Sequence, residues 1–250
     1  MLWRRLVASS GGADSVTVIT DGLLYHFIAP ASGLTVANAG SVSGNWNCEG
    51  IKVAGPTCVG GGLEIDTTDL DQLQFPGVPT AGTVGTICYW QRKPAGANNV
   101  GLTVGAHAGN SYSGYLVLPR TTDIFAAIGQ GSGTPSSATR YQVEFTPTAD
   151  WDLGLFFNDE EWVHIAVTFN IAPTTNNRPV DAWFNGLPHG NALGNGFLTS
   201  VGFASGARIG PGNWQLSSTI NGTGAQFADI RVYDRQLSDV EIALIAAGNG

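Results

Sequence analysis

The sequence contains few charged residues. They make up 12% of the 250-residue chain, about half of the usual quarter, and only two are lysines, Lys52 and Lys93. With a net charge of −8, the chain has no basic stripe to neutralise a phosphate backbone, so no nucleic-acid partner is expected. No apolar run approaches the ~18 residues of a membrane span, so no membrane partner is expected either.

Cysteine is also scarce. Cys48, Cys58 and Cys88 are too few and too irregularly spaced for a zinc site or a disulfide framework. We interpret all three as small apolar side chains without a disulfide partner. A Cys48–Cys58 pair across a loop remains an alternative.

The N-terminus lacks a long apolar region. In MLWRRLVASSGG a basic pair precedes a short apolar piece, well below the roughly 7–15 apolar residues of a secretory signal, so export by the usual route is not expected. Residues 1–20, with Trp3, Arg4 and Arg5, are either an arm that docks on a partner or a disordered terminus. Residues 21–250 are predicted to form one domain.

Turn residues and alternating segments are abundant. Glycine occurs 35 times, about twice its usual share, and Gly, Pro, Ser and Asn clusters separate short segments with period-two patterning. In EEWVHIAVTFN, Val163, Ile165, Val167 and Phe169 share one face, which predicts a half-buried strand. The other predicted strands are 15–20, 22–29, 62–66, 84–93, 114–119, 140–146, 180–186, 207–210 and 227–234. Such a series of short strands favours an antiparallel sandwich or jelly roll.

One helix is predicted, at the C-terminal end. In RQLSDVEIALIAAGNG, Ser238 and Glu241 have the spacing of a capping box, and Gly248 is placed to end the helix. The fold class predicted is therefore all-β with one short C-terminal helix.

Several motifs occur in a recognisable order: DGLLYHF, GGGLEID, VGTICYWQRKP, EEWVHIAVTFN, VDAWFNG, ARIG and FADIRVYDRQLSDVEI. From about residue 21 to residue 250 this order resembles the laminin-G-like, concanavalin A-like jelly-roll superfamily. The resemblance implies two antiparallel sheets stacked face to face, one convex and one concave. It also implies that Trp162 and His164 are framework residues.

Catalytic patterns of related jelly rolls are incomplete. Glycoside hydrolases of this kind place acids at alternate positions of one strand, but Glu64 and Asp66 are followed on that face by Thr68, and Asp69 falls on the other side. Polysaccharide-lyase chemistry needs residue types that are present, without the motif spacing, at Gln91, Arg92, Tyr141 and His164. We therefore predict no catalytic residues.

The resemblance implies a calcium ion at Asp229, because such domains often hold one with a carboxylate of the closing strand. Asp21 and carbonyls near Gly22 would complete the six to eight oxygens that calcium favours. Alternation places Phe227, Asp229, Arg231 and Tyr233 on one face. The alternative is that Asp229 pairs with an arginine or caps a turn.

Four aromatic residues in loop-like sequence are candidates for sugar binding, since their rings combine an apolar face with a polar edge. They are Tyr112, Tyr115, Trp151 and Trp214. The alternative is that each ring folds over the rim of the core.

These observations favour a non-catalytic structural or adhesion protein. We interpret it as a surface component of a virus particle, such as a bacteriophage capsid decoration or fibre protein, assembled in the host cytoplasm. Its expected partners are other virion proteins, a cell-surface glycan and further copies of the chain. The alternatives are a carbohydrate-active enzyme, either a glycoside hydrolase or a polysaccharide lyase, and a soluble extracellular lectin.

Overall fold

The structure, a computed structural model, is mostly β-sheet. It describes residues 19–28, 35–47, 57–59, 62–65, 73–74, 84–92, 102–108, 111–119, 124–132, 140–145, 162–170, 180–192, 208–211 and 225–248. Within these ranges the chain forms sixteen strands and one helix, α2 (Asp239–Ala246). The predicted all-β class with one short C-terminal helix is confirmed for this part of the chain.

The strands form two antiparallel sheets of eight strands each. In sheet A the order is β14-β13-β12-β7-β16-β5-β4, and β1 also pairs with β16. Its strands are β1 (Leu23–Phe27), β4 (Thr57–Val59), β5 (Gly62–Ile65), β7 (Val84–Arg92), β12 (Trp162–Asn170), β13 (Val180–Phe184), β14 (Leu187–Ala192) and β16 (Ala225–Tyr233).

The strands of sheet B are interspersed along the sequence with those of sheet A. Its order is β11-β10-β9-β8-β15-β6-β3-β2. Its strands are β2 (Thr35–Ala37), β3 (Asn45–Asn47), β6 (Leu73–Gln74), β8 (Leu102–Ala108), β9 (Ser111–Pro119), β10 (Ile124–Ser132), β11 (Arg140–Phe145) and β15 (Arg208–Pro211).

Most predicted strands are present, and several more were missed. The segments at 84–93, 140–146, 162–170 and 227–234 correspond to β7, β11, β12 and β16, whereas most of 15–20 lies outside the described residues. The missed strands include β8 (LTVGAHA) and β10 (IFAAIGQGS). Their Gly and Ala content lowers intrinsic strand preference, so their pairing with β9 decides the conformation.

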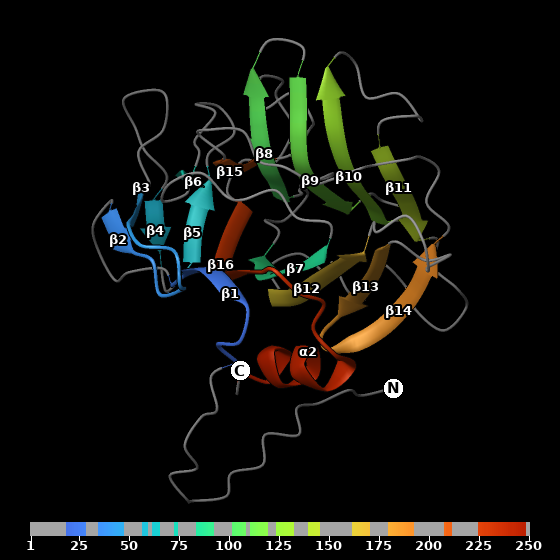
Figure 1. The fold of residues 1–250 in the computed structure, drawn as a ribbon. Coiled ribbons are helices and arrows are strands. Elements are labelled where there is room, and N and C mark those ends of the chain that lie inside the picture. The colour runs from blue at the N-terminus through green and yellow to red at the C-terminus, as the bar shows by residue number, and fades with distance from the viewer. Residues whose placement is uncertain are drawn as a thin grey trace, which may run out of the picture.

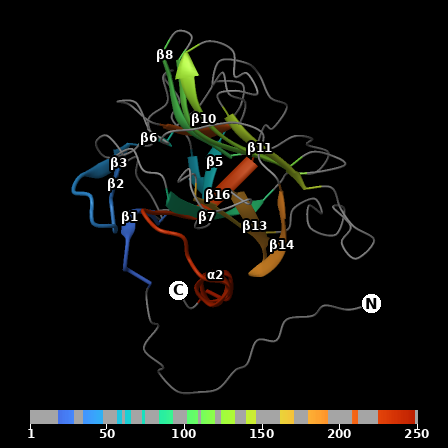
Figure 2. The same cartoon turned by 45° about the vertical axis from the view of Figure 1, so that its right-hand side comes forward.

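The two sheets pack against each other through aromatic rings. Trp46 of β3 is fully buried, and its ring centroid lies 5.9 Å from that of Tyr25 and 5.6 Å from that of Phe27, both in β1 of sheet A. The face of sheet B that bears Trp46 therefore faces sheet A. Strands β8 to β11 lie on one side of sheet A and α2 lies on the other (Figures 1 and 2).

Strand β12 is buried on both faces, so the prediction of a half-buried strand was wrong. Val163, Ile165 and Val167 are buried as predicted, but His164, Ala166 and Thr168 on the other face are buried too. That second face belongs to a cluster in which side chains of α2 and its approach cover sheet A. Its members are Ile19, Leu23, Cys88, Ala166, Trp183, Tyr233, Leu237, Ile242 and Ile245.

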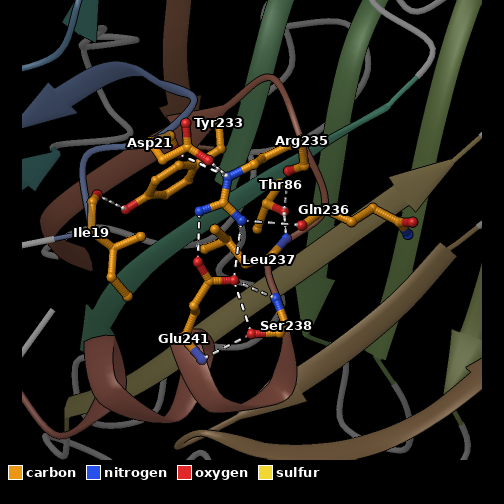
Figure 3. A network of polar contacts seen from close by, with 9 residues as sticks. All are labelled: Ile19, Asp21, Thr86, Tyr233, Arg235, Gln236, Leu237, Ser238 and Glu241. Carbon is orange, nitrogen blue, oxygen red and sulfur yellow. Dashed lines mark hydrogen bonds and ion pairs between the residues drawn. The ribbon is translucent and has the colours of Figure 1, made fainter.

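A polar network holds α2 in place (Figure 3). Arg235 donates from Nη2 to Oε1 of Glu241 at 2.6 Å and from Nε to the Asp21 carbonyl at 3.0 Å, which joins the chain near β1 to the helix. Ser238 and Glu241 form the predicted capping box, and Gly248 follows the helix with a φ of 77°. The segment from Arg235 to Glu241 thus contains residues that anchor and cap α2.

The β13–β14 hairpin turns through Phe184-Asn185-Gly186. Both Asn185 and Gly186 have positive φ, of 50° and 79°, as a tight two-residue hairpin requires. Asn185 Oδ1 accepts a hydrogen bond from the backbone N–H of His164 at 3.0 Å, and its own N–H donates to the His164 carbonyl at 2.8 Å. These bonds agree with a framework role for the β12 motif.

Candidate functional site

A β-bulge in the closing strand places Asp229. In the pairing of β16 with β7, Ala228 is opposite Trp90 but Arg231 is opposite Cys88, so β16 carries one extra residue there. Asp229 has a φ of 47°, a left-handed conformation that Asp tolerates better than most residues.

The bulge breaks the alternation expected for this strand. Phe227 is fully buried and its ring lies 6.0 Å from that of Tyr89, whereas Tyr233 belongs to the cluster that packs against α2. The prediction that Phe227 shares a face with Arg231 and Tyr233 was therefore wrong, because one inserted residue reverses the face on one side of the bulge.

Asp229 pairs with an arginine and a histidine. Its Oδ1 accepts from Arg231 Nε at 2.8 Å and lies 2.7 Å from His26 Nε2, while its Oδ2 accepts from Arg231 Nη2 at 3.0 Å. Burial alone would raise the pKa of the Asp229 carboxyl, but these hydrogen bonds and charges outweigh it and lower that pKa to about 2. Asp229 is thus held as a carboxylate.

These surroundings do not fit the calcium ion that the resemblance implies. Calcium is coordinated by oxygen atoms, whereas both carboxylate oxygens of Asp229 contact nitrogen atoms of His26 or Arg231. Asp21, the second expected ligand, pairs instead with Arg235 at 3.0 Å. Within the described ranges, no group of three or more His, Cys, Asp and Glu residues gathers as a metal site would require. The geometry matches the alternative, in which Asp229 pairs with an arginine.

His164 is buried without hydrogen bonds from its ring. Neither Nδ1 nor Nε2 has a partner in the part of the chain that the structure describes, and the ring packs at an edge against Trp90 with centroids 5.3 Å apart. Burial is the main cause that lowers the pKa of His164 to about 4. A neutral, enclosed ring of this kind supports the sheet and is not placed to exchange protons with a substrate.

The residue types of a lyase do not assemble. Gln91 and Arg92 are consecutive in β7 and so lie on opposite faces of sheet A, while Tyr141 belongs to β11 in sheet B. Of the hydrolase candidates, Glu64 lies in β5, whereas Asp66 and Asp69 lie outside the described residues. Cys88 is buried, which raises the pKa of its thiol to about 12 and suppresses the nucleophilic thiolate.

The candidate sugar-binding residues divide into two groups. Trp151 and Trp214 lie outside the described residues, as do Trp3, Arg4 and Arg5 of the predicted arm, and so does Cys48 of the alternative disulfide. Tyr112 and Tyr115 both lie in β9, three positions apart, and therefore occupy opposite faces of sheet B.

The pairing register of the strands shows which tyrosine lies on the face of sheet B that packs against sheet A. Tyr115 is opposite Val104 and Ile128, and this row continues through Ile209 to Leu73 on the face that bears Trp46. Tyr112 is opposite His107 and Gly131 on the face turned away from sheet A. The register therefore places Tyr115 on the face of sheet B toward sheet A and Tyr112 on the opposite face, and their role in sugar binding stays a prediction.

The face with Tyr112 carries a row that sequence reasoning missed. Direct lateral pairing joins one residue from each of the eight strands of sheet B, and none of them is apolar apart from glycine. We call this set the polar row: Thr35, Asn47, Gln74, Arg208, Gly105, Gly114, Gly129 and Arg140. Its members come from segments far apart in sequence, so only the strand order reveals it.

Comparisons with known proteins show similarity at the level of the fold. No protein-family model matches the chain, and no curated protein matches it. Among solved structures, it is similar to the binding domain of botulinum neurotoxin serotype G, with 13% identity, a TM-score of 0.61, and coverage of 90% of this chain and 50% of that one.

Two further solved structures are similar to the same extent. The binding domain of botulinum neurotoxin DC, in complex with SialylT, has a TM-score of 0.61 and 12% identity over 92% of this chain and 52% of that one. The binding domain of Paraclostridial Mosquitocidal Protein 1 has a TM-score of 0.59 and 12% identity, covering 91% and 52%. The chain thus spans about half the length of the structures it resembles.

The one described helix, α2, is too short to cross a membrane, and the structure offers no membrane-spanning helix within its described ranges.

Proposed function

We propose that this protein is a non-catalytic adhesion module that binds glycans through the face of sheet B that bears Tyr112. The observation that carries the proposal is the separation of the two tyrosines, because it leaves Tyr112 on the face that does not pack on sheet A. Solved binding domains of similar fold, one of them in complex with SialylT, support it by analogy. Fold alone does not determine function, so the site must carry the test.

We also infer that this module has a laminin-G-like jelly-roll fold. The order of the sequence motifs and the two stacked antiparallel sheets support this assignment. We further infer a place on the surface of a virus particle, with Trp3, Arg4 and Arg5 docking on a capsid or tail protein. The basic-aromatic start of the sequence and the low lysine content motivate this inference.

Glycan binding is tested on an array with matched variants of β9. We expect Tyr112→Ala to abolish binding and leave the melting temperature nearly unchanged, whereas Tyr115→Ala lowers the melting temperature by removing a ring from the core face. Trp151→Ala and Trp214→Ala extend the test to the other two candidates. A wild-type chain that binds no glycan, or Tyr112→Ala that binds as wild type, would contradict the proposed site.

The virion inference is tested separately. Full-length chain and a chain without residues 1–20 are mixed with bare capsids and sedimented. Co-sedimentation of the full-length chain alone is the expected result. Absence of binding by the full-length chain contradicts the docking role and leaves the glycan proposal untouched.

A further inference from the structure

The polar row is unusual for the strands in which it lies. Its three glycines, Gly105, Gly114 and Gly129, are direct lateral neighbours in the adjacent strands β8, β9 and β10. Interior strand positions favour β-branched and aromatic residues, and glycine there often marks a place where a ligand or another backbone comes close. Three such positions side by side weaken the sheet and leave its surface without side chains over the middle of the row.

An arginine stands at each end of these glycines. Arg208 of β15 is the register partner of Gly105, and Arg140 of β11 is the register partner of Gly129. The two positions are four strand spacings apart, so their backbones are separated by about 19 Å at roughly 4.8 Å per strand. Charged residues are rare in this chain, which makes two arginines in one row informative.

No acidic residue adjoins either arginine in the described strands. The register neighbours of Arg208 are Gln74 and Gly105, and the neighbour of Arg140 is Gly129. Along β11 on the same face, Gln142 follows Arg140 and Glu144 follows two places further on. The polar row itself thus contains two arginines and no acidic residue, in a chain whose net charge is −8.

This arrangement suits an anionic sugar chain. A guanidinium presents paired N–H donors that match the oxygens of a carboxylate or sulfate group. Tyr112 shares the face with Gly114 in β9, and His107 is its register partner in β8. An aromatic ring and a polar edge beside the arginines are the groups that bind the apolar and hydroxyl faces of a sugar.

Resting on the glycan-binding function proposed above, we propose that the polar row is the glycan site and that it selects an anionic glycan: Arg140 and Arg208, at the two ends of Gly105, Gly114 and Gly129, bind carboxylate or sulfate groups. The glycines leave room for the chain to lie close to the sheet. Binding of the two arginines to anionic groups of the glycan should weaken as the salt concentration rises, because dissolved ions screen exposed charge pairs.

The test compares each anionic glycan with its neutral counterpart. The full-length chain is titrated with heparin oligosaccharides, oligogalacturonate and sialyllactose, and with dextran oligosaccharides and lactose as neutral probes. We expect at least one anionic probe to bind roughly tenfold or more tightly than the neutral probes, since hydrogen bonds to charged groups exceed neutral ones by about that factor. The three anionic probes distinguish sulfate from the carboxylate of a uronate or sialate.

Variants then locate the site. Arg140→Gln and Arg208→Gln should each weaken anionic binding roughly tenfold and reduce its salt dependence. Gly114→Glu should abolish it, whereas Gly114→Gln, of nearly equal size, should weaken it less because it adds no repelling charge. Arg92→Gln in sheet A removes the same charge elsewhere, and melting temperatures of all variants confirm that they fold.

The outcomes separate this inference from the general function. Equal binding of anionic and neutral probes, or arginine variants that bind as wild type while Tyr112→Ala abolishes binding, overturns the anionic selectivity and keeps glycan binding. Binding of a DNA duplex as tight as that of the best anionic glycan also overturns it, as it indicates a general polyanion surface. Absence of binding to every glycan contradicts the proposed function and the inference together.

Discussion

The arginines at the end of β16 and those of sheet B have different neighbours. Arg231 in β16 and Arg235, which follows β16, each bond a carboxylate, of Asp229 and Glu241 respectively. In sheet B, the register neighbours of Arg140 and Arg208 are glycine and glutamine. The pairs of Arg231 and Arg235 join parts of the scaffold. Within the described strands, the lack of an acidic register neighbour beside Arg140 and Arg208 is the contrast that supports the binding role proposed for sheet B.

These two ion pairs, Arg231–Asp229 in β16 and Arg235–Glu241 beside α2, also differ in burial. The side chains of Arg231 and Asp229 are 7% and 28% exposed, whereas those of Arg235 and Glu241 are 27% and 26% exposed. Removing one partner of a buried pair leaves a charge that water cannot easily reach, which costs more than removing a partner at the surface. The contribution of each pair to stability is thus predicted to follow its burial.

The largest effect is expected from Arg231→Met. It leaves the Asp229 carboxylate without its two guanidinium bonds and should lower the free energy of unfolding by about 3 kcal/mol, measured by urea unfolding at neutral pH. The double variant Arg231→Met/Asp229→Asn should recover part of this loss, because no buried charge remains unpaired. A loss no greater than that of Arg235→Met would contradict the ranking by burial.

The lowered pKa of His164 predicts that the folded protein becomes less stable as the pH falls. Its folded pKa of about 4 lies below the ordinary value of 6.5, so the unfolded chain binds more protons between these pH values and stability falls as pH falls. From pH 7.5 to pH 5 the expected loss is about 2 kcal/mol. This window lies above that of Asp229, whose lowered pKa matters only below its ordinary value of 3.8.

The matched variant for this effect is His164→Leu, compared with wild type by urea unfolding at both pH values. Leucine cannot titrate and has no ring nitrogen to leave without a hydrogen bond, so the variant should lose clearly less stability on acidification. Wild type and variant with the same pH dependence would show that another group causes the acid sensitivity.

Ser238→Ala tests the anchorage of α2 with a smaller change. The hydroxyl of Ser238 accepts from the Glu241 N–H at 3.4 Å and donates to Glu241 Oε2 at 2.9 Å. Loss of this cap should cost about 1 kcal/mol, measured by urea unfolding. Ser238→Asp keeps an acceptor at the cap and serves as the control, with a smaller expected loss. If the alanine and aspartate variants lose stability equally, the hydroxyl does not act as a cap.

Sequence patterns predicted local features of the fold well. Strands β7 and β12, the capping box of Ser238 and Glu241, and the helix end at Gly248 depend on residues close together in the chain, and all are present. The burial of both faces of β12 was missed because the residues that cover it, such as Ile242 and Leu237, come about 70 positions later.

The candidate site was harder to predict, for two physical reasons. The extra residue at Asp229 reverses the face of Phe227, and alternation in sequence does not reveal such a bulge. The polar row depends on the pairing of strands that are far apart, such as β6 with β15 and β15 with β8. The sequence analysis placed Tyr112 and Tyr115 in loop-like sequence and predicted a strand only over 114–119, whereas β9 begins at Ser111 and puts the two tyrosines on opposite faces.

The smallest effect on the free energy of unfolding is expected at Asp21, which belongs to the most exposed of the ion pairs compared. Its carboxylate lies 3.0 Å from Arg235 Nε, but its side chain is 88% exposed, so water solvates both the paired and the unpaired charge. Asp21→Asn should change the free energy of unfolding by less than about 0.5 kcal/mol, and by less still in high salt, because screening removes what attraction remains. The Asp21 backbone carbonyl keeps its bond to Arg235 in the variant. A loss as large as that of Ser238→Ala would mean that the side-chain pair itself anchors α2, and that burial does not decide which charges hold this scaffold.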